Sequence, residues 1–185
     1  IVSDINRHTI RAMQTSFKLD NWKPISFKNL FDIEYWELEQ AKLNKGDNHP
    51  EFQGKIAIIT GAANGIGNAI AKKMLNNGCN VVGLDKNKKI KELFSEYDSY
   101  EGIFCNLNNT SDIKKAVSSC VKKFGGLDIL ISNAGVFSTS EKLDSINDNK
   151  WNKDLNFNLT THYKVLRESI PYLKQGIDPS VIFMG

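Results

Sequence analysis

Short apolar runs alternate with longer, helix-periodic stretches along most of the chain from Lys55 onward. The apolar runs are rich in Val and Ile and predict strands over residues 55–60, 80–85, 101–105, 127–132 and 180–184. Strands that are apolar almost throughout are typical of parallel sheets covered on both faces. The alternation therefore predicts an α/β fold, a doubly wound parallel sheet with right-handed crossovers.

The stretches between these strands carry apolar stripes at helical spacing. The first predicted helix covers residues 66–77 and ends at Gly78, and its stripe is Ile66, Ile70 and Met74. Thr110 or Ser111 is expected to cap the next helix. The longest predicted helix covers residues 146–174, and its expected inward stripe is Trp151, Leu155, Leu159, Leu166, Ile170 and Leu173.

The region ahead of Lys55 has a different organisation. Residues 2–16 predict an amphipathic helix, and the aromatic-rich stretch "FDIEYWELEQAKLN" predicts a second helix that needs a surface to pack against. The segment around Gly46 and Pro50 has no periodicity. These patterns divide the chain into a helical segment at 1–44, a linker at 45–53 and a sheet-forming domain at 54–185.

Composition narrows the classes of function. The net charge is +3, and most of the basic residues are scattered lysines, with 3 arginines in the chain, so nucleic-acid binding is not expected. No apolar run could span a bilayer and no signal peptide is visible, which favours a cytoplasmic protein. The three cysteines show no close spacing and are expected to be buried thiols. The three histidines match no ligand spacing, so no metal site is expected.

The stretch "TGAANGIG" marks the most informative turn of the chain. It lies where the first strand hands over to the first helix, at residues 60–67. Gly61 allows a sharp turn, Gly65 removes a Cβ where a pyrophosphate would touch the backbone, and Gly67 allows close packing. The free N–H groups near Asn64 and Ile66, together with the helix dipole, favour a bound diphosphate.

The TGxxxGxG spacing resembles the short-chain dehydrogenase/reductase family, whose dinucleotide-binding domain has the Rossmann fold. The resemblance covers residues 53–185. It implies that Asp85, 18 residues after Gly67, accepts hydrogen bonds from the adenosine ribose and repels a 2′-phosphate. Asn64 is neutral where relatives that use NADP often carry a basic residue. The positive charge of Lys86 is a weak argument for NADP. The implied cofactor is NAD.

Three further segments carry the same resemblance. Asn106 and Leu107 stand where the family usually has Asp followed by Val or Leu around the adenine, and the amide is expected to weaken that recognition. The segment "LISNAGV" implies that Asn133, Ala134 and Gly135 line the ribose, with Ser132 replacing an Asn of the family pattern. Asn158 in "FNL" matches the Asn that joins the family's catalytic set by holding a water.

The family's proton-transfer residues have no counterpart in these 185 residues. The reaction needs a Ser after the fifth strand and a Tyr-x-x-x-Lys one helix later, in which the Lys lowers the Tyr pKa. Tyr163-x-x-x-Arg167 is the nearest pattern, and it lies one helix too early. We therefore expect a fragment, truncated at both ends and after the fifth strand, that shows no dehydrogenase turnover by itself.

The upstream stretch "LFDIEYWELEQAKL" resembles the join in bifunctional proteins that fuse a class II aldolase to a short-chain dehydrogenase. Those are described as rhamnulose-1-phosphate aldolase/alcohol (lactaldehyde) dehydrogenases. The resemblance implies that residues 1–44 are the C-terminal end of an aldolase domain. The alternative is a family-specific N-terminal extension.

Together these features predict an NAD-dependent oxidoreductase that acts on a small alcohol or aldehyde, for example lactaldehyde from deoxysugar breakdown. One alternative is a dinucleotide-binding domain without catalysis. Another is a methyltransferase, which shares a glycine-rich first turn and an acidic residue after the second strand, although the "SNAG" and "FNL" segments argue against it. Family resemblance also implies a homo-oligomer in the full-length protein, assembled through the helix at 146–174 and the next helix along the chain.

Overall fold

The computed structural model describes residues 2–19, 23–34, 50–137, 142 and 144–184. Contacts divide the chain into two units, Ile1–His49 and Pro50–Gly185, and each is described by itself. The predicted linker at 45–53 lies mostly outside the described residues. Its described end, from Pro50, folds with the second unit, because the Phe52 N–H donates to the Asn77 carbonyl. The domain boundaries stay a prediction.

The second unit is built on a parallel sheet of five strands, which confirms the predicted fold class. The strands are β1 (Ile56–Thr60), β2 (Asn80–Asp85), β3 (Tyr100–Phe104), β4 (Ile129–Ser132) and β5 (Ser180–Phe183). Their order is β3-β2-β1-β4-β5, and every neighbouring pair is parallel. The chain therefore adds β2 and β3 on one side of β1, and then returns to add β4 and β5 on the other side. This reversal beside β1 places a crevice at the carboxyl ends of β1 and β4.

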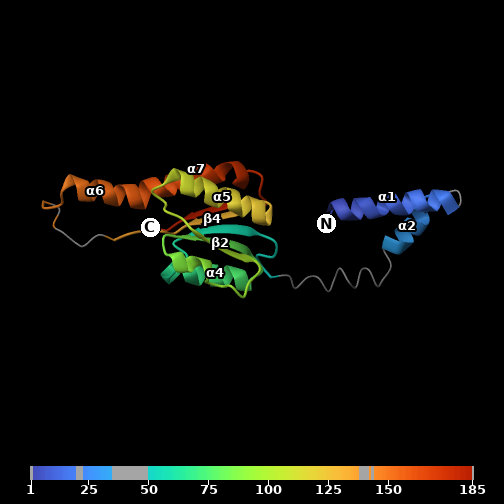
Figure 1. Cartoon of the computed structure of the whole chain (residues 1–185), viewed down its shortest axis with the longest axis horizontal. Coiled ribbons are helices and arrows are strands. Elements are labelled where there is room, and N and C mark those ends of the chain that lie inside the picture. The colour runs from blue at the N-terminus through green and yellow to red at the C-terminus, as the bar shows by residue number, and fades with distance from the viewer. Residues whose placement is uncertain (1, 20–22, 35–49, 138–141, 143, 185) are drawn as a thin grey trace. The chain divides into compact units, whose positions relative to one another are not determined.

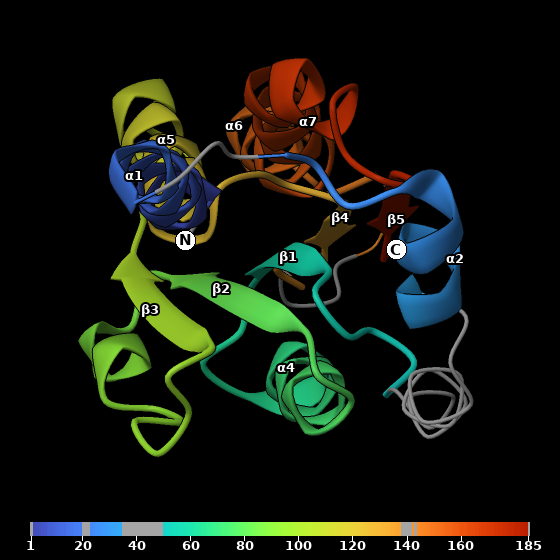
Figure 2. The same ribbon diagram turned by 90° about the vertical axis from the view of Figure 1, so that its right-hand side faces the viewer.

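Helices cover both faces of the sheet, which explains the continuous apolar strands. Figures 1 and 2 show α4 (Gly65–Asn76) on one face and α5 (Thr110–Phe124) and α7 (Thr161–Leu173) on the other. Alternate residues of β1 enter separate cores: Ile58 packs toward α5 and α7, and Ile59 packs toward α4. All five residues of β1 are buried.

Two predictions about helices α4 and α5 need correction. In α4 the buried residues are Gly67, Ala71, Met74 and Leu75, while Ile66 is 62% exposed. Ile66 lies in the first turn of α4, before the residues of this helix that are buried against the sheet. The stop at Gly78 is confirmed, with φ +84° and its N–H donating to the Leu75 carbonyl. The cap of α5 is Asn109, whose side chain accepts from the Ser111 N–H, so neither Thr110 nor Ser111 caps it.

The long helix predicted at 146–174 consists of three parts. These are α6 (Asp148–Leu155), a π-helical turn, η3 (Asn156–Thr160), and α7. The Thr161 N–H donates to the Asn156 carbonyl, five residues earlier. An added residue in one turn rotates the later part of the helix by about 100° relative to the earlier part. A single stripe therefore cannot face the sheet, and the predicted one is wrong for its exposed members, Trp151, Leu155, Leu159 and Ile170.

The buried face of α7 consists of Thr161, His162, Val165, Ser169 and Leu173. Of the predicted stripe, Leu173 is buried and Leu166 is partly buried against the same core. The residues of β5 are exposed along its whole length, in contrast to the strands at the centre of the sheet.

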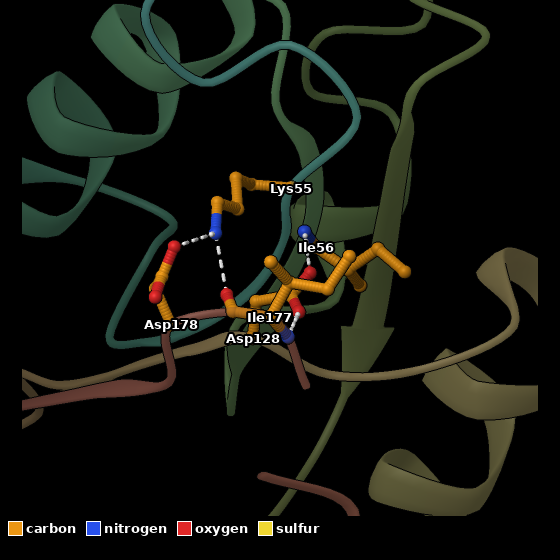
Figure 3. A network of polar contacts seen from close by, with 5 residues as sticks. All are labelled: Lys55, Ile56, Asp128, Ile177 and Asp178. Carbon is orange, nitrogen blue, oxygen red and sulfur yellow. Dashed lines mark hydrogen bonds and ion pairs between the residues drawn. The ribbon is translucent and has the colours of Figure 1, made fainter. Parts of the chain in front are cut away.

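A buried carboxylate ties the amino ends of two strands to the loop before β5 (Figure 3). Asp128 is 7% exposed and immediately precedes β4. Its two oxygens accept from the Ile56 N–H at 2.9 Å and from the Ile177 N–H at 2.8 Å. Lys55 donates to the Ile177 carbonyl and forms an ion pair with exposed Asp178 at 3.7 Å. This network lies at the end of the sheet opposite the crevice.

The first unit contains α1 (Val2–Leu19) and α2 (Phe27–Glu34). The predicted helix at 2–16 is confirmed and extends to Leu19. Its apolar side chains are largely exposed, among them Ile5, Ile10 and Phe17. The aromatic stretch predicted as a second helix lies mainly outside the described residues.

Candidate functional site

A pocket of about 300 Å³ lies at the carboxyl ends of β1, β2 and β4, where the strand order reverses. Loops that follow four strands line it, and the π-helical turn adds Phe157. Ten residues predicted from the sequence line it: Gly61, Asn64, Gly65, Ile66, Asp85, Asn106, Leu107, Asn133, Ala134 and Gly135. Gly67 and Asn158 are not among the lining residues. The crevice of an open α/β sheet is the usual place for a ligand.

The three glycines of the turn have separate structural reasons. Gly61 (φ +68°) and Gly65 (φ +56°) adopt the left-handed conformation that side chains disfavour. A Cβ on Gly61 would lie 3.1 Å from the Ala134 Cα, whereas a Cβ on Gly65 would meet no atom within 4 Å. Gly65 therefore presents open backbone to the pocket. Gly67 lies behind it, where a Cβ would come within 2.3 Å of the Gly61 carbonyl oxygen.

Substitution of Gly67 by alanine is expected to lower the free energy of unfolding by about 2–3 kcal/mol, because backbone must move to admit the methyl group. Urea unfolding followed by circular dichroism measures this loss. Gly126 is the matched control, since its Cβ would meet only the Ile56 side chain at 3.7 Å. Gly126→Ala should change stability by less than about 0.5 kcal/mol. Equal losses in the two variants would contradict the packing role of Gly67.

The amino end of α4 begins directly at this turn. Asn64 is its N-cap residue, with extended backbone, and its side chain makes no capping hydrogen bond. The first backbone N–H groups of a helix have no partner within the helix, and the helix dipole adds partial positive charge there. The exposed N-terminal turn at Asn64, Gly65 and Ile66 therefore offers a favourable environment for an anion at the pocket wall.

Asp85 stands at the end of β2 and is fixed by backbone donors. Its Oδ2 accepts from the Ala63 N–H at 3.0 Å, and its Oδ1 accepts from the Asn87 N–H at 2.9 Å. The first bond ties the acid to the glycine turn. Each carboxylate oxygen has further lone-pair capacity for a donor in the pocket. Lys86, the next residue, also lines the pocket.

Thr60 holds the opposite wall, a role that the sequence pattern did not predict. Its buried Oγ1 accepts from the Asn133 N–H at 2.9 Å and from the Ala134 N–H at 3.0 Å. The Asn133 side-chain amide donates back to the Thr60 carbonyl at 3.0 Å. The sequence did offer one signal for this role, the Thr that opens "TGAANGIG". A hydroxyl at the end of β1 can accept hydrogen bonds from the backbone that leaves the neighbouring strand.

Two predicted residues are engaged by their own neighbours. The Oδ1 of Asn106 accepts from the Asn108 N–H at 3.1 Å, so this oxygen closes a local turn and keeps one lone pair for an outside donor. Leu107 is 6% exposed and belongs to the core cluster under α5 while also reaching the pocket.

Asn158 lies on the π-helical turn and contacts backbone. Its Oδ1 accepts from the Val136 N–H, and its Nδ2 donates to the Val136 carbonyl, both at 2.9 Å. The amide thus clamps the segment that leaves β4. The pocket-lining residues that were not among the predicted site residues are Leu84, Lys86, Cys105, Val136 and Phe157.

Cys105 borders the pocket but is not equipped to react. Burial raises the pKa of its thiol to about 12, and nearby Asp112 adds to the effect. The other two cysteines are likewise buried free thiols whose pKa is raised by burial to about 12. A thiol with such a pKa is protonated at neutral pH and is a poor nucleophile.

Metal ligands and membrane spans are two other features that bear on function. Among the described residues, no three or more His, Cys, Asp or Glu side chains gather in a way that could hold a metal ion. Within the same part of the chain, no helix combines the length and the apolar character that crossing a membrane requires.

The pocket's geometry and comparison with known families lead to one assignment. Residues 55–185 match the model of the short chain dehydrogenase family. The chain belongs to the short-chain dehydrogenase family. This membership excludes the methyltransferase interpretation.

Relatives of this short-chain dehydrogenase support the same assignment. The short chain dehydrogenase adrF of Penicillium rubens is 35% identical over 134 residues, which cover 72% of this chain and 52% of the relative. Asnovolin H dehydrogenase nvfC of Aspergillus novofumigatus is 34% identical over 128 residues, covering 69% of this chain and 49% of the relative. The chain thus spans about half the length of these curated relatives.

Solved structures share the fold. A 3-ketoacyl-(acyl-carrier-protein) reductase from Brucella melitensis complexed with NADH has 29% identity and a TM-score of 0.63, covering 66% of this chain and 52% of that one. Aldohexose dehydrogenase from Thermoplasma acidophilum, in ligand-free form, has 29% identity and a TM-score of 0.65 over 74% of this chain and 51% of its own.

The first unit has a separate match. Residues 1–43 match the second domain of the class II aldolase family. The uncharacterized oxidoreductase YuxG of Bacillus subtilis is 29% identical over 187 residues, covering 97% of this chain and 27% of the relative. That similarity extends over both units.

Proposed function

We propose that this chain supplies the NAD-binding site of a short-chain oxidoreductase that acts on a small alcohol or aldehyde. The observation that carries the proposal is the pocket itself, which is lined by the open glycine turn at the start of α4 and, bonded to that turn, by the carboxylate of Asp85. Relatives of the family are dehydrogenases and reductases, and one similar structure is complexed with NADH.

The lining residues fit a dinucleotide by their chemistry. The bare backbone at Gly65 and the N–H groups of the first α4 turn would hold the diphosphate. Asp85 would accept hydrogen bonds from the ribose hydroxyls, and its negative charge disfavours a 2′-phosphate. The bound cofactor would supply the hydride acceptor. The wall formed by Asn133, Ala134 and Gly135 would exclude water from one side of it.

The role of these 185 residues in proton transfer is narrower. They contain no Tyr-x-x-x-Lys, so we expect them to bind the dinucleotide and not to oxidise an alcohol by themselves. Asn158 stays a predicted member of the catalytic set, and its described hydrogen bonds are to the backbone of Val136. Because these residues contain no Tyr-x-x-x-Lys, a non-catalytic dinucleotide-binding domain stays the second candidate function.

We further propose the wider context of the protein. The class II aldolase match at residues 1–43 supports a fusion of an aldolase to the dehydrogenase. For such a fusion we propose lactaldehyde as the substrate of the dehydrogenase. Exposed Trp151, Leu155 and Leu159 support assembly of the full-length protein as a homo-oligomer. The buried free thiols support a cytoplasmic location.

Titration calorimetry tests the proposed site. We expect NADH to bind at least about tenfold more tightly than NADPH, because a 2′-phosphate would lie against the Asp85 carboxylate. S-adenosylmethionine serves as the control ligand and should not bind. Tighter binding of NADPH would refute the NAD assignment, and binding of neither dinucleotide would refute the site.

A further inference from the structure

The wall segment, residues 132–136, leaves β4 and forms one side of the pocket. Four of its residues line the pocket, yet the segment has no regular structure beyond Ser132. Ser132 is held by backbone, since the Met184 N–H donates to its carbonyl at 3.1 Å. The rest of the segment is tied to its neighbours through side chains. On the β1 side, Thr60 accepts from the N–H groups of Asn133 and Ala134.

The other side of the wall segment is held by the helix above it. Asn158 makes two hydrogen bonds to the backbone of Val136, and His162 pairs its Nδ1 with the Ser132 Oγ at 2.7 Å. Asn158 and His162 are four residues apart, spanning the join of the π-helical turn and α7. The helix thus holds both ends of the wall segment, while Phe157 of the same turn lines the pocket directly.

The His162–Ser132 pair is well suited to fix a position. His162 is 7% exposed and Ser132 is 1% exposed. The imidazole also packs edge-on against Phe183 of β5, with ring centroids 5.9 Å apart. Burial lowers the pKa of His162 below its ordinary value of 6.5, which favours the neutral ring. A buried hydrogen bond of this kind is costly to lose, because a polar group is left without a partner.

We infer that His162 is a positioning residue of the pocket, which through Ser132 holds the wall segment in the place that a bound dinucleotide requires. The inference rests on the proposed dinucleotide function. His162 is not among the pocket-lining residues, so it acts on a ligand only through the wall segment. Ser132, which stands where the family pattern has Asn, gives the histidine its partner in this chain.

Four variants of the 185-residue protein test this inference: His162→Leu, His162→Gln, Ser132→Ala and the His162→Leu/Ser132→Ala double variant. Hydrogen exchange measured by mass spectrometry reports on a peptide covering residues 129–137, and fluorescence titration reports on NADH affinity. His162→Leu should speed exchange in this peptide and weaken NADH binding about tenfold. His162→Gln keeps a donor and an acceptor, and should restore affinity to within about threefold.

The double variant should bind NADH no more weakly than His162→Leu alone, because both substitutions remove the same bond. Leu173→Ala is the control for a general loss of stability, since Leu173 is buried on α7 near its far end. It should lower the melting temperature while leaving exchange in 129–137 and NADH affinity within about twofold.

Equal effects of Leu173→Ala, additive losses in the double variant, or no rescue by glutamine would overturn the inference. Unchanged exchange in His162→Leu would overturn it as well. If the unsubstituted protein binds no dinucleotide, the proposed function fails. Hydrogen exchange in residues 129–137 then still decides whether His162 positions the wall segment, because exchange that is fast in His162→Leu should be slow again in His162→Gln.

Discussion

Substitution of Asp85 by alanine is expected to lower the ratio of NADH affinity to NADPH affinity by about tenfold or more. The carboxylate is held by the N–H groups of Ala63 and Asn87, so its negative charge has a fixed place at the pocket. Removal of the charge takes away acceptors for the ribose hydroxyls and also the repulsion of a 2′-phosphate. Fluorescence titration of both reduced dinucleotides measures the ratio.

The ratio separates recognition from a general disturbance of the turn. Loss of the Ala63 bond could loosen the glycine turn, but a looser turn would weaken both dinucleotides alike. Lys86→Ala is the companion variant, because its cation favours a phosphate. It should shift the ratio toward NADH by about twofold to threefold, a small effect typical of an exposed charge. An unchanged ratio in Asp85→Ala would show that another group selects the cofactor.

The strands could be predicted because burial on both faces leaves a strong mark on composition. Each predicted strand agrees with an observed one to within two residues at either end. The pocket could also be located, since the glycine turn and the acid both follow predicted parallel strands, and ligands of such sheets bind at the carboxyl ends of the strands. The expectation for Gly67 came close to the observed contact, in which no side chain fits against the Gly61 carbonyl.

The helix stripes were less predictable, because periodicity assumes a regular helix. Ile66 keeps the spacing of a buried residue but lies in the first turn, at the mouth of the pocket. In the long helix, the π-helical turn changes which residues face the sheet. The spacing of the apolar residues does not predict this turn. Leu155 and Leu159 precede or occupy this turn, and both are exposed.

The polar contacts of the site were the hardest part to predict from the sequence. Thr60 is separated from Asn133 by 73 residues, and Ser132 is separated from His162 by 30. Such pairs depend on the strand register and on the rotation of a helix above it. Single residues such as a lone buried His carry no signal of their partner. The structure supplies what the pattern lacks, which is the side on which each residue lies.

Replacement of Asp128 by asparagine is expected to lower the free energy of unfolding by about 3 kcal/mol. The two oxygens of Asp128 each accept from a backbone N–H, in a buried bond from Ile56 and in a part-buried bond from Ile177. An amide has one oxygen, so its NH₂ group would face the second donor and leave it without a partner. A buried unsatisfied donor costs about 1–3 kcal/mol, and the lost bond was strengthened by charge. Urea unfolding measures the change.

Asp178→Asn provides a closely matched control, because the same chemical change is made on the same network. Asp178 is 94% exposed and contributes an ion pair to Lys55 at 3.7 Å, and asparagine tolerates its positive φ of 49°. An exposed ion pair contributes little, so the loss should stay below about 0.5 kcal/mol. Equal losses would show that the charge near Lys55, and not the two backbone bonds, stabilises this end of the sheet. A large loss in Asp128→Asn alone would instead show that the two Asp128 bonds to backbone, which join β1, β4 and the loop before β5, stabilise this end of the sheet.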